Sequence, residues 1–194
     1  MRKYEEEHYR FEHIKDKIYP WIVRDLKDVK AINKGMLSEK DTALLQFDEE
    51  LKVAFAIKRG EEIYEILQDA MLPPQTDVLC VYQKACENLA KDIEFVISNT
   101  MYGAFGILAD GMHEASAICL QSIWQTCADK LEDDLLIAVP AKDAVLFARM
   151  NDTQAVKTMI QHAKGEYDRG VGTLTLQLYR YRKDEKLFEK YEGV

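Results

Sequence analysis

The sequence lacks the features that mark membrane and exported proteins. Its longest apolar runs, such as LLIAVP, fall far short of the roughly 20 residues that a spanning helix needs. The opening stretch, MRKYEEEHYRFEHIKDKIYPW, has no apolar segment after its first charges, so a signal peptide is not expected. We therefore expect a cytoplasmic protein that does not contact a membrane.

Residues that hold metals or perform redox chemistry are also scarce and poorly spaced. The chain has four cysteines, Cys80, Cys86, Cys119 and Cys127. Its four histidines are His8, His13, His113 and His162. None of these residues has the spacing of a metal or disulfide-exchange motif, and no P-loop, dinucleotide fingerprint or kinase signature occurs. We expect reduced, buried thiols and neither a metal nor another cofactor.

Basic charge is in deficit, because 26 Lys and Arg face 34 Asp and Glu, which gives a net charge of −8. This balance argues against direct nucleic-acid binding, which requires clustered Lys and Arg. An acidic surface either keeps the protein in solution or attracts a partner with a basic surface. The length of 194 residues and the 47% apolar content predict a single globular domain that covers residues 1 to 194.

The two ends of the chain are rich in charge and aromatic residues. Residues 1–17 carry a thin apolar stripe at helical spacing, which predicts an amphipathic N-terminal helix. A second short helix is expected from Ile18 to Leu26, with Pro20 in its first turn, and a loop over residues 36–48. Residues 182–194 read as a charged tail. Aromatic residues at the two ends could dock on each other or on a partner.

Between these ends, two strands and a helix follow one another three times. The expected strands cover residues 51–58, 62–67, 93–98, 101–108, 135–139, 144–149 and 173–181. One helix is expected after a cap at Thr76 or Asp77, and two more are expected over residues 112–131 and 152–164. We predict an α+β fold, a mainly antiparallel sheet of repeated ββα units with helices packed on one face and preceded by N-terminal helices. The units recur at about forty residues, so true repetition and coincidence both stay open.

The stretch ILADGMHEASAICLQSIW, residues 107 to 124, gathers four reactive side chains: Asp110, His113, Glu114 and Ser116. Helix capping accounts for most of these side chains, because Asp110 suits the start of a helix and Glu114 suits its first turn. Ser116 should then point away from the buried stripe, and His113 is left unexplained. No second histidine follows as in a zinc protease, and no glycine flanks Ser116 as in a nucleophile elbow. Likewise, the carboxylate run Glu132 to Asp134 is interpreted as a solvated face.

Several of these segments together resemble the YtpQ-like family of uncharacterised bacterial proteins. The resemblance covers roughly residues 18 to 180 and rests on IYPWIV, LKVAFAI, the Ala85-x-x-Asn88-Leu89 pattern, the Asp110-Gly111 segment with its Glu-Ala-Ser, and AVPAKDAVLF. Lys142 stands where the family commonly has Arg. The resemblance implies a soluble bacterial protein and no activity, since none is established for that family. It draws attention to the turn from Pro140 to Asp143.

Three functions remain open from the sequence. The first is a non-enzymatic interaction or regulatory protein with a protein partner or a second copy of itself, in its sharpest form an acidic inhibitor or immunity-type protein. The second is an enzyme whose site is assembled from Asp110, His113, Glu114, Ser116, Lys142 and Asp143. The third is a small-ligand pocket lined by Gly103, Gly106 and Trp124.

Overall fold

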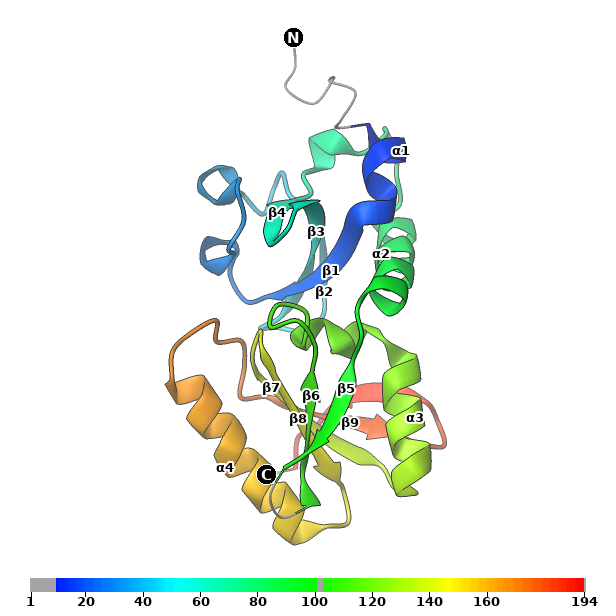
Figure 1. Ribbon diagram of the computed structural model, residues 1–194, viewed down its shortest axis with the longest axis vertical. Coiled ribbons are helices and arrows are strands. Elements are labelled where there is room, and N and C mark those ends of the chain that lie inside the picture. Colours follow the sequence, from blue (N-terminus) through cyan, green and yellow to red (C-terminus); the bar gives the residue numbers. More distant parts are fainter. Residues whose placement is uncertain (1–9, 101–102, 194) are drawn as a thin grey trace. The chain divides into compact units, whose positions relative to one another are not determined.

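The computed structural model describes residues 10–100 and 103–193 (Figure 1). The chain divides into two compact units, the N-terminal unit Met1–Ile93 and the C-terminal unit Glu94–Val194. Each unit has its own antiparallel sheet. The α+β class with mainly antiparallel pairing is confirmed, whereas the single sheet expected from the sequence is replaced by two. Within the described residues, no helix has the length and apolar character required to cross a membrane.

The N-terminal unit is built around one long strand. Its strands are β1 (Ile18–Val23), β2 (Leu44–Gln46), β3 (Lys52–Gly60) and β4 (Ile63–Ile66). Its α-helices are α1 (Phe11–Ile14) and α2 (Val78–Asp92), and short 3-10 turns cover Lys15–Lys17, Leu26–Asp28, Lys34–Met36 and Asp69–Met71. Strand β3 pairs with β1 on one side and with β2 and β4 on the other. The predicted β3–β4 hairpin is therefore confirmed.

The second helix expected after residue 18 is wrong, because this segment is strand β1. All six of its residues are buried, so its apolar side chains occupy both faces of a strand and not one stripe of a helix. Pro20 is tolerated because β1 is an edge strand, which pairs with β3 alone in the part of the chain that the structure describes. The N-terminal helix is also shorter than expected: α-helix covers Phe11–Ile14, and residues 1–9 lie outside the described part.

Helix α2 begins and packs as the sequence predicts. The side chain of Asp77 accepts a hydrogen bond from the amide of Leu79 at 2.9 Å and caps the helix. Farther along, the buried amide of Asn88 donates to the carbonyls of Lys15 and Ile18 at 2.8 and 2.9 Å. These bonds join α2 to the segment that leads into β1, and so fix the helix against the sheet.

The C-terminal unit contains a six-stranded sheet of order β10-β9-β7-β8-β6-β5. Its strands are β5 (Val96–Asn99), β6 (Phe105–Leu108), β7 (Leu135–Ala141), β8 (Ala144–Arg149), β9 (Leu178–Arg182) and β10 (Leu187–Lys190). Its helices are η7 (Ala115–Cys119), α3 (Gln121–Leu131) and α4 (Thr153–Asp168). The single helix expected over residues 112–131 is broken at Leu120, where the backbone leaves the helical region.

The two long helices of this unit cover opposite faces of the sheet, not one face as predicted (Figure 1). On one face, Leu136 and Leu146 pack in the same cluster as Met159 of α4. On the other face, Phe147 lies 5.7 Å from the ring of Trp124 in α3. Strand β7 is buried along its whole length, because an uninterrupted apolar run suits a strand covered on both sides.

The expected charged tail instead forms the last hairpin. Strand β10 pairs with β9 after a turn in which Lys186 adopts a positive φ of 53°. The ring of Phe188 stacks on Tyr179 at 5.4 Å and lies 6.1 Å from Trp124. The C-terminal aromatic residues therefore pack within their own unit, while Tyr4 and Tyr9 lie outside the described residues.

Candidate functional site

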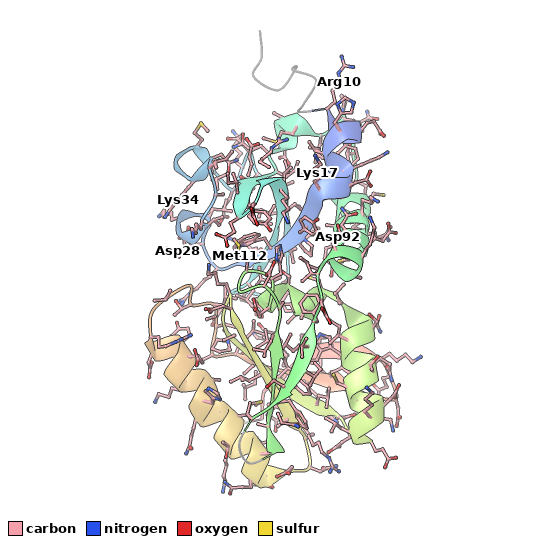
Figure 2. The ribbon with its side chains drawn as sticks, viewed as in Figure 1. Arg10, Lys17, Asp28, Lys34, Asp92 and Met112 are labelled. Carbon is pink, nitrogen blue, oxygen red and sulfur yellow. The ribbon has the colours of Figure 1, made fainter. Side chains whose placement is uncertain are left out.

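The loop between β6 and η7 is organised by its own carboxylates; Met112, labelled in Figure 2, belongs to it. Oδ1 of Asp110 accepts hydrogen bonds from the amides of Met112 and His113, both at 3.0 Å. Oδ2 of Asp110 lies 2.8 Å from Nδ1 of His113. Asp110 thus caps this tight turn and orients the imidazole, instead of capping a long helix.

Glu114 closes the same loop from its other end. Its Oε1 accepts from the amides of Ala109 and Gly111 at 3.0 and 2.8 Å. Its Oε2 is buried and has no hydrogen-bond partner among the described residues. The carboxylate therefore acts as an acceptor for the loop backbone, not as a first-turn charge at a helix dipole.

Burial separates His113, Glu114 and Ser116 from any reactant. His113, Glu114 and Ser116 are 0%, 4% and 2% exposed, whereas the Asp110 side chain is 39% exposed. The prediction that Ser116 points outward is wrong, because η7 is a 3-10 turn with about three residues per turn and a different buried face. A general base must reach its substrate, and the fully buried imidazole does not reach the surface.

The electrostatics of Asp110 agree with a structural role. Partial desolvation acts to raise the pKa of this carboxyl, but the charge and hydrogen bond of His113 and the amides of Met112 and His113 outweigh it. The pKa of Asp110 is consequently lowered from its ordinary value of 3.8. Asp110 stays ionised near neutral pH, as a turn cap and partner of an imidazole should.

The second motif that the sequence singled out does meet this loop, through the backbone. The amide of Ala115 donates to the carbonyl of Lys142 at 3.0 Å, and the amide of Lys142 donates to the carbonyl of Gly172 at 2.9 Å. The Lys142 side chain lies against Gly172, where an added Cβ would be 2.8 Å from Lys142 Cγ. Asp143 is exposed at the turn. No set of three metal-ligating side chains occurs in the described part of the chain.

A groove lies elsewhere in this unit. It measures about 380 Å³ and is lined by Ile160, Lys164, Leu176, Gln177, Leu178, Tyr191 and Glu192. None of the candidate residues lines it. Trp124, expected beside a ligand pocket, is 0% exposed and fills the core, where its indole donates to the carbonyl of Ala117 at 2.9 Å.

In the carboxylate run after α3, Glu132 is exposed as predicted, whereas Asp133 and Asp134 are not part of a solvated face. Asp133 is buried and accepts from the amide and the side chain of Asn151 at 3.0 and 2.9 Å. Asp134 accepts from the Arg180 guanidinium at 2.5 and 3.0 Å and from the Lys183 amide at 2.9 Å. These two carboxylates join neighbouring strand ends, so they are part of the fold.

The feature that sequence reasoning missed is the open edge, which we define as strand β5 (Val96–Asn99) together with Leu108 on β6. The sheet ends at β5, which pairs with β6 alone among the residues that the structure describes (Figure 1). Val96, Ile97 and Leu108 are 49%, 41% and 54% exposed. The strand reads VISN and carries no charge and no proline. The sequence predicted a strand over residues 93–98 followed by a turn, but not its position at the edge of the sheet.

Comparisons with known proteins give a partial likeness. No family model matches the chain, and no solved structure matches it. The chain is 27% identical over 120 residues to a C/D-type subunit of NADH-quinone oxidoreductase from Aquifex aeolicus, a match that covers 62% of this chain and 19% of that protein. It is also 27% identical over 123 residues to the C/D-type subunit of the same enzyme from Hydrogenobaculum, covering 62% of this chain and 20% of that one. The chain thus spans about a fifth of the length of these relatives.

Proposed function

We propose that this chain is a non-enzymatic interaction protein, cytoplasmic and regulatory or structural in role, that binds a protein partner at the open edge. The observation that carries the proposal is an edge strand that pairs on one side alone within the described part of the chain and exposes aliphatic side chains on both faces. An extended segment can add to such an edge, where main-chain hydrogen bonds give affinity and side-chain contacts give specificity. Natural proteins blunt an edge that is not used, because it otherwise causes aggregation.

The N-terminal unit supports this reading by contrast. On the outer side of β4, the Asn33 side chain donates to the carbonyl of Ile66 at 2.7 Å and accepts from its amide at 3.0 Å. The amide of Ile32 donates to the carbonyl of Tyr64 at 2.9 Å. A loop therefore occupies the backbone groups that β4 would offer to another chain, and β1 at the opposite edge carries Pro20 and is fully buried.

Charge and similarity give further support. A net charge of −8 suits a partner with a basic surface, as expected of an acidic inhibitor or immunity-type protein. The relatives are named as subunits, which are parts of a multi-chain enzyme. A segment that resembles part of such a protein is consistent with binding to other chains. The identity of 27% does not carry the relatives' activity over to this chain.

An enzyme is the second candidate, and the observation in its favour is the 2.8 Å contact between Asp110 and His113. The other hydrogen bonds of Asp110, from the amides of Met112 and His113, hold the loop together and need no catalytic role. Catalysis at His113 would require the loop to open, since the imidazole is completely buried. We therefore rank the interaction function first.

The test is capture of partners by the tagged full-length chain from cell extract, read by mass spectrometry, with mass photometry of the purified chain beside it. Val96→Lys places a charge on the open edge, and Leu187→Lys is the matched control, because Leu187 is a 45% exposed aliphatic residue on the opposite edge strand. We expect a stoichiometric partner that the wild type and the control retain and that Val96→Lys loses. Equal retention by all three proteins, or no stoichiometric partner at all, would refute the proposal.

A further inference from the structure

From the open edge we infer the chemistry of its occupant: an extended segment of another protein with adjacent aliphatic residues that continue into Lys or Arg. This inference rests on the proposed function and adds the identity of the partner's side chains. It follows from three properties of the edge, namely where its apolar groups lie, where its charges lie, and how poorly it would match a second copy of itself.

The apolar groups lie at one end of β5 and on both of its faces. Val96 pairs with Leu108 and Ile97 pairs with Ile107, so the two exposed aliphatic residues of β5 project to opposite sides of the sheet. Ser98 and Asn99 follow, so the other half of the strand is polar. The side chains of an added strand alternate between the two faces and lie beside those of the edge strand. Two adjacent aliphatic residues would therefore cover Val96 and Ile97, one on each face.

The charges lie beyond the same end. Residues 94 to 110 contain no Lys and no Arg, and their charged residues are Glu94 and Asp110. Glu94 precedes Val96 by two positions and Asp110 follows its partner Leu108 by two, so carboxylates border the aliphatic pair on both strands. Both are exposed. A segment that runs past Val96 meets negative charge there, and a basic side chain suits that position.

A second copy of this chain fits less well. Antiparallel pairing of two β5 strands about their centre would set Val96 opposite Asn99 and Ile97 opposite Ser98, so each apolar residue would face a polar one. Two copies would also bring together edges that are bordered only by negative charge, from Glu94 and Asp110. A heterologous segment avoids both mismatches, because its aliphatic and basic residues can be placed opposite the complementary groups.

The probes are three labelled octapeptides in which valine and isoleucine occupy two central adjacent positions among threonines, ending in two lysines, two glutamines or two glutamates. Binding to the full-length chain is followed by fluorescence anisotropy at low and high salt. We expect the lysine peptide to bind about tenfold more tightly than the glutamate peptide, with the difference falling as salt screens the charges. Glu94→Gln should reduce the preference for lysine, whereas the control Asp168→Asn, an exposed carboxylate on α4, should leave it unchanged.

The failures of this inference and of the proposed function can be told apart. If the glutamate peptide binds as tightly as the lysine peptide, the charge complementarity is wrong. If no peptide binds while Val96→Lys still loses a partner from extract, the proposed function stands and the inferred partner chemistry falls. Concentration-dependent dimers that Val96→Lys abolishes would assign the edge to a second copy and overturn the inference.

Discussion

The two ends of the six-stranded sheet differ in almost every property that matters for binding. At one end, β10 carries Glu189 and Lys190 and is tied to the core by the ring of Phe188, which stacks on Tyr179 at 5.4 Å. At the other end, β5 carries no charge and presents half-exposed Val96 and Ile97. The β10 edge is thus protected against pairing with other chains, and the β5 edge is not.

This contrast indicates what each edge does. Phe188 of β10 packs against the rings of Tyr179 and Trp124, so changing it should cost stability. The aliphatic residues of the open edge contribute little to the core, so changing them should cost binding. Substitution of packed residues should lower the free energy of unfolding by about 2–3 kcal/mol, whereas substitution at the open edge should leave it almost unchanged.

Phe188→Ala should destabilise the C-terminal unit by about 2–3 kcal/mol, because it removes a ring packed between Tyr179 and Trp124. Phe188 is partly exposed, so the expected loss lies near the lower end for aromatic truncations. Chemical denaturation followed by tryptophan fluorescence measures it. Phe188→Leu, which keeps most of the apolar volume, should recover much of the loss; an alanine variant as stable as the wild type would remove the claim that β10 is part of the core.

Glu114→Ala should destabilise the same unit by about 2 kcal/mol, because the amides of Ala109 and Gly111 lose their acceptor. This loop continues from β6, the strand on which the open edge depends. Glu114→Gln keeps a side-chain oxygen that can accept and should cost clearly less in the same denaturation experiment. If Glu114→Gln loses as much stability as Glu114→Ala, the carboxylate has a role other than accepting these hydrogen bonds.

Stability should fall in acid partly because the ion pair of Asp134 with Arg180, which stabilises the β9–β10 hairpin, is lost. Desolvation acts to raise the pKa of Asp134, but hydrogen bonds from Lys183 and Arg180 outweigh it and lower the pKa from 3.8. A carboxyl with a lowered pKa stabilises the fold above its ordinary pKa, and this contribution is lost as the pH falls through the folded-state pKa. Both side chains are partly exposed, so the contribution is below about 1 kcal/mol.

Thermal unfolding of wild type and Asp134→Asn across about pH 2 to 7 checks this. The difference in Tm between the two should be greatest near neutral pH and should shrink below about pH 4. A constant difference over the whole range would contradict the assignment.

Val96→Lys itself should change the free energy of unfolding by no more than about 0.5 kcal/mol, because Val96 is half exposed. Its effect should be on partner retention alone. Circular dichroism and chemical denaturation measure the change in stability. A loss of several kcal/mol in the free energy of unfolding would mean that Val96 is part of the core, and the β5 edge would then not differ from the β10 edge in this respect.

Much of the local structure follows from the sequence, because its causes are local. The helix capped by Asp77, the hairpin of β3 and β4 and the alternation of hairpins with helices rest on capping, turn residues and periodicity. Strand β1 was mistaken for a helix because Ile18, Trp21 and Ile22 satisfy helical spacing by coincidence, in a segment where every residue is buried. Apolar spacing alone does not separate these cases.

The candidate site shows where sequence reasoning stops. The capping role of Asp110 was predictable, and the backbone contact between Ala115 and Lys142 brings together the two segments that the sequence singled out. The burial of Ser116 depends on a 3-10 turn that the residues of this segment do not predict. The open edge depends on strand order, a non-local property, so the predicted strand over residues 93–98 did not reveal the exposure of Val96 and Ile97.

The most direct test of binding at the open edge is hydrogen–deuterium exchange of the full-length chain with and without the partner retained in the capture experiment. We predict new protection of the amides of Val96–Asn99, with the amides of Leu187–Lys190 unchanged. Protection that appears at β10 or in the N-terminal unit while β5 exchanges as before would contradict this prediction.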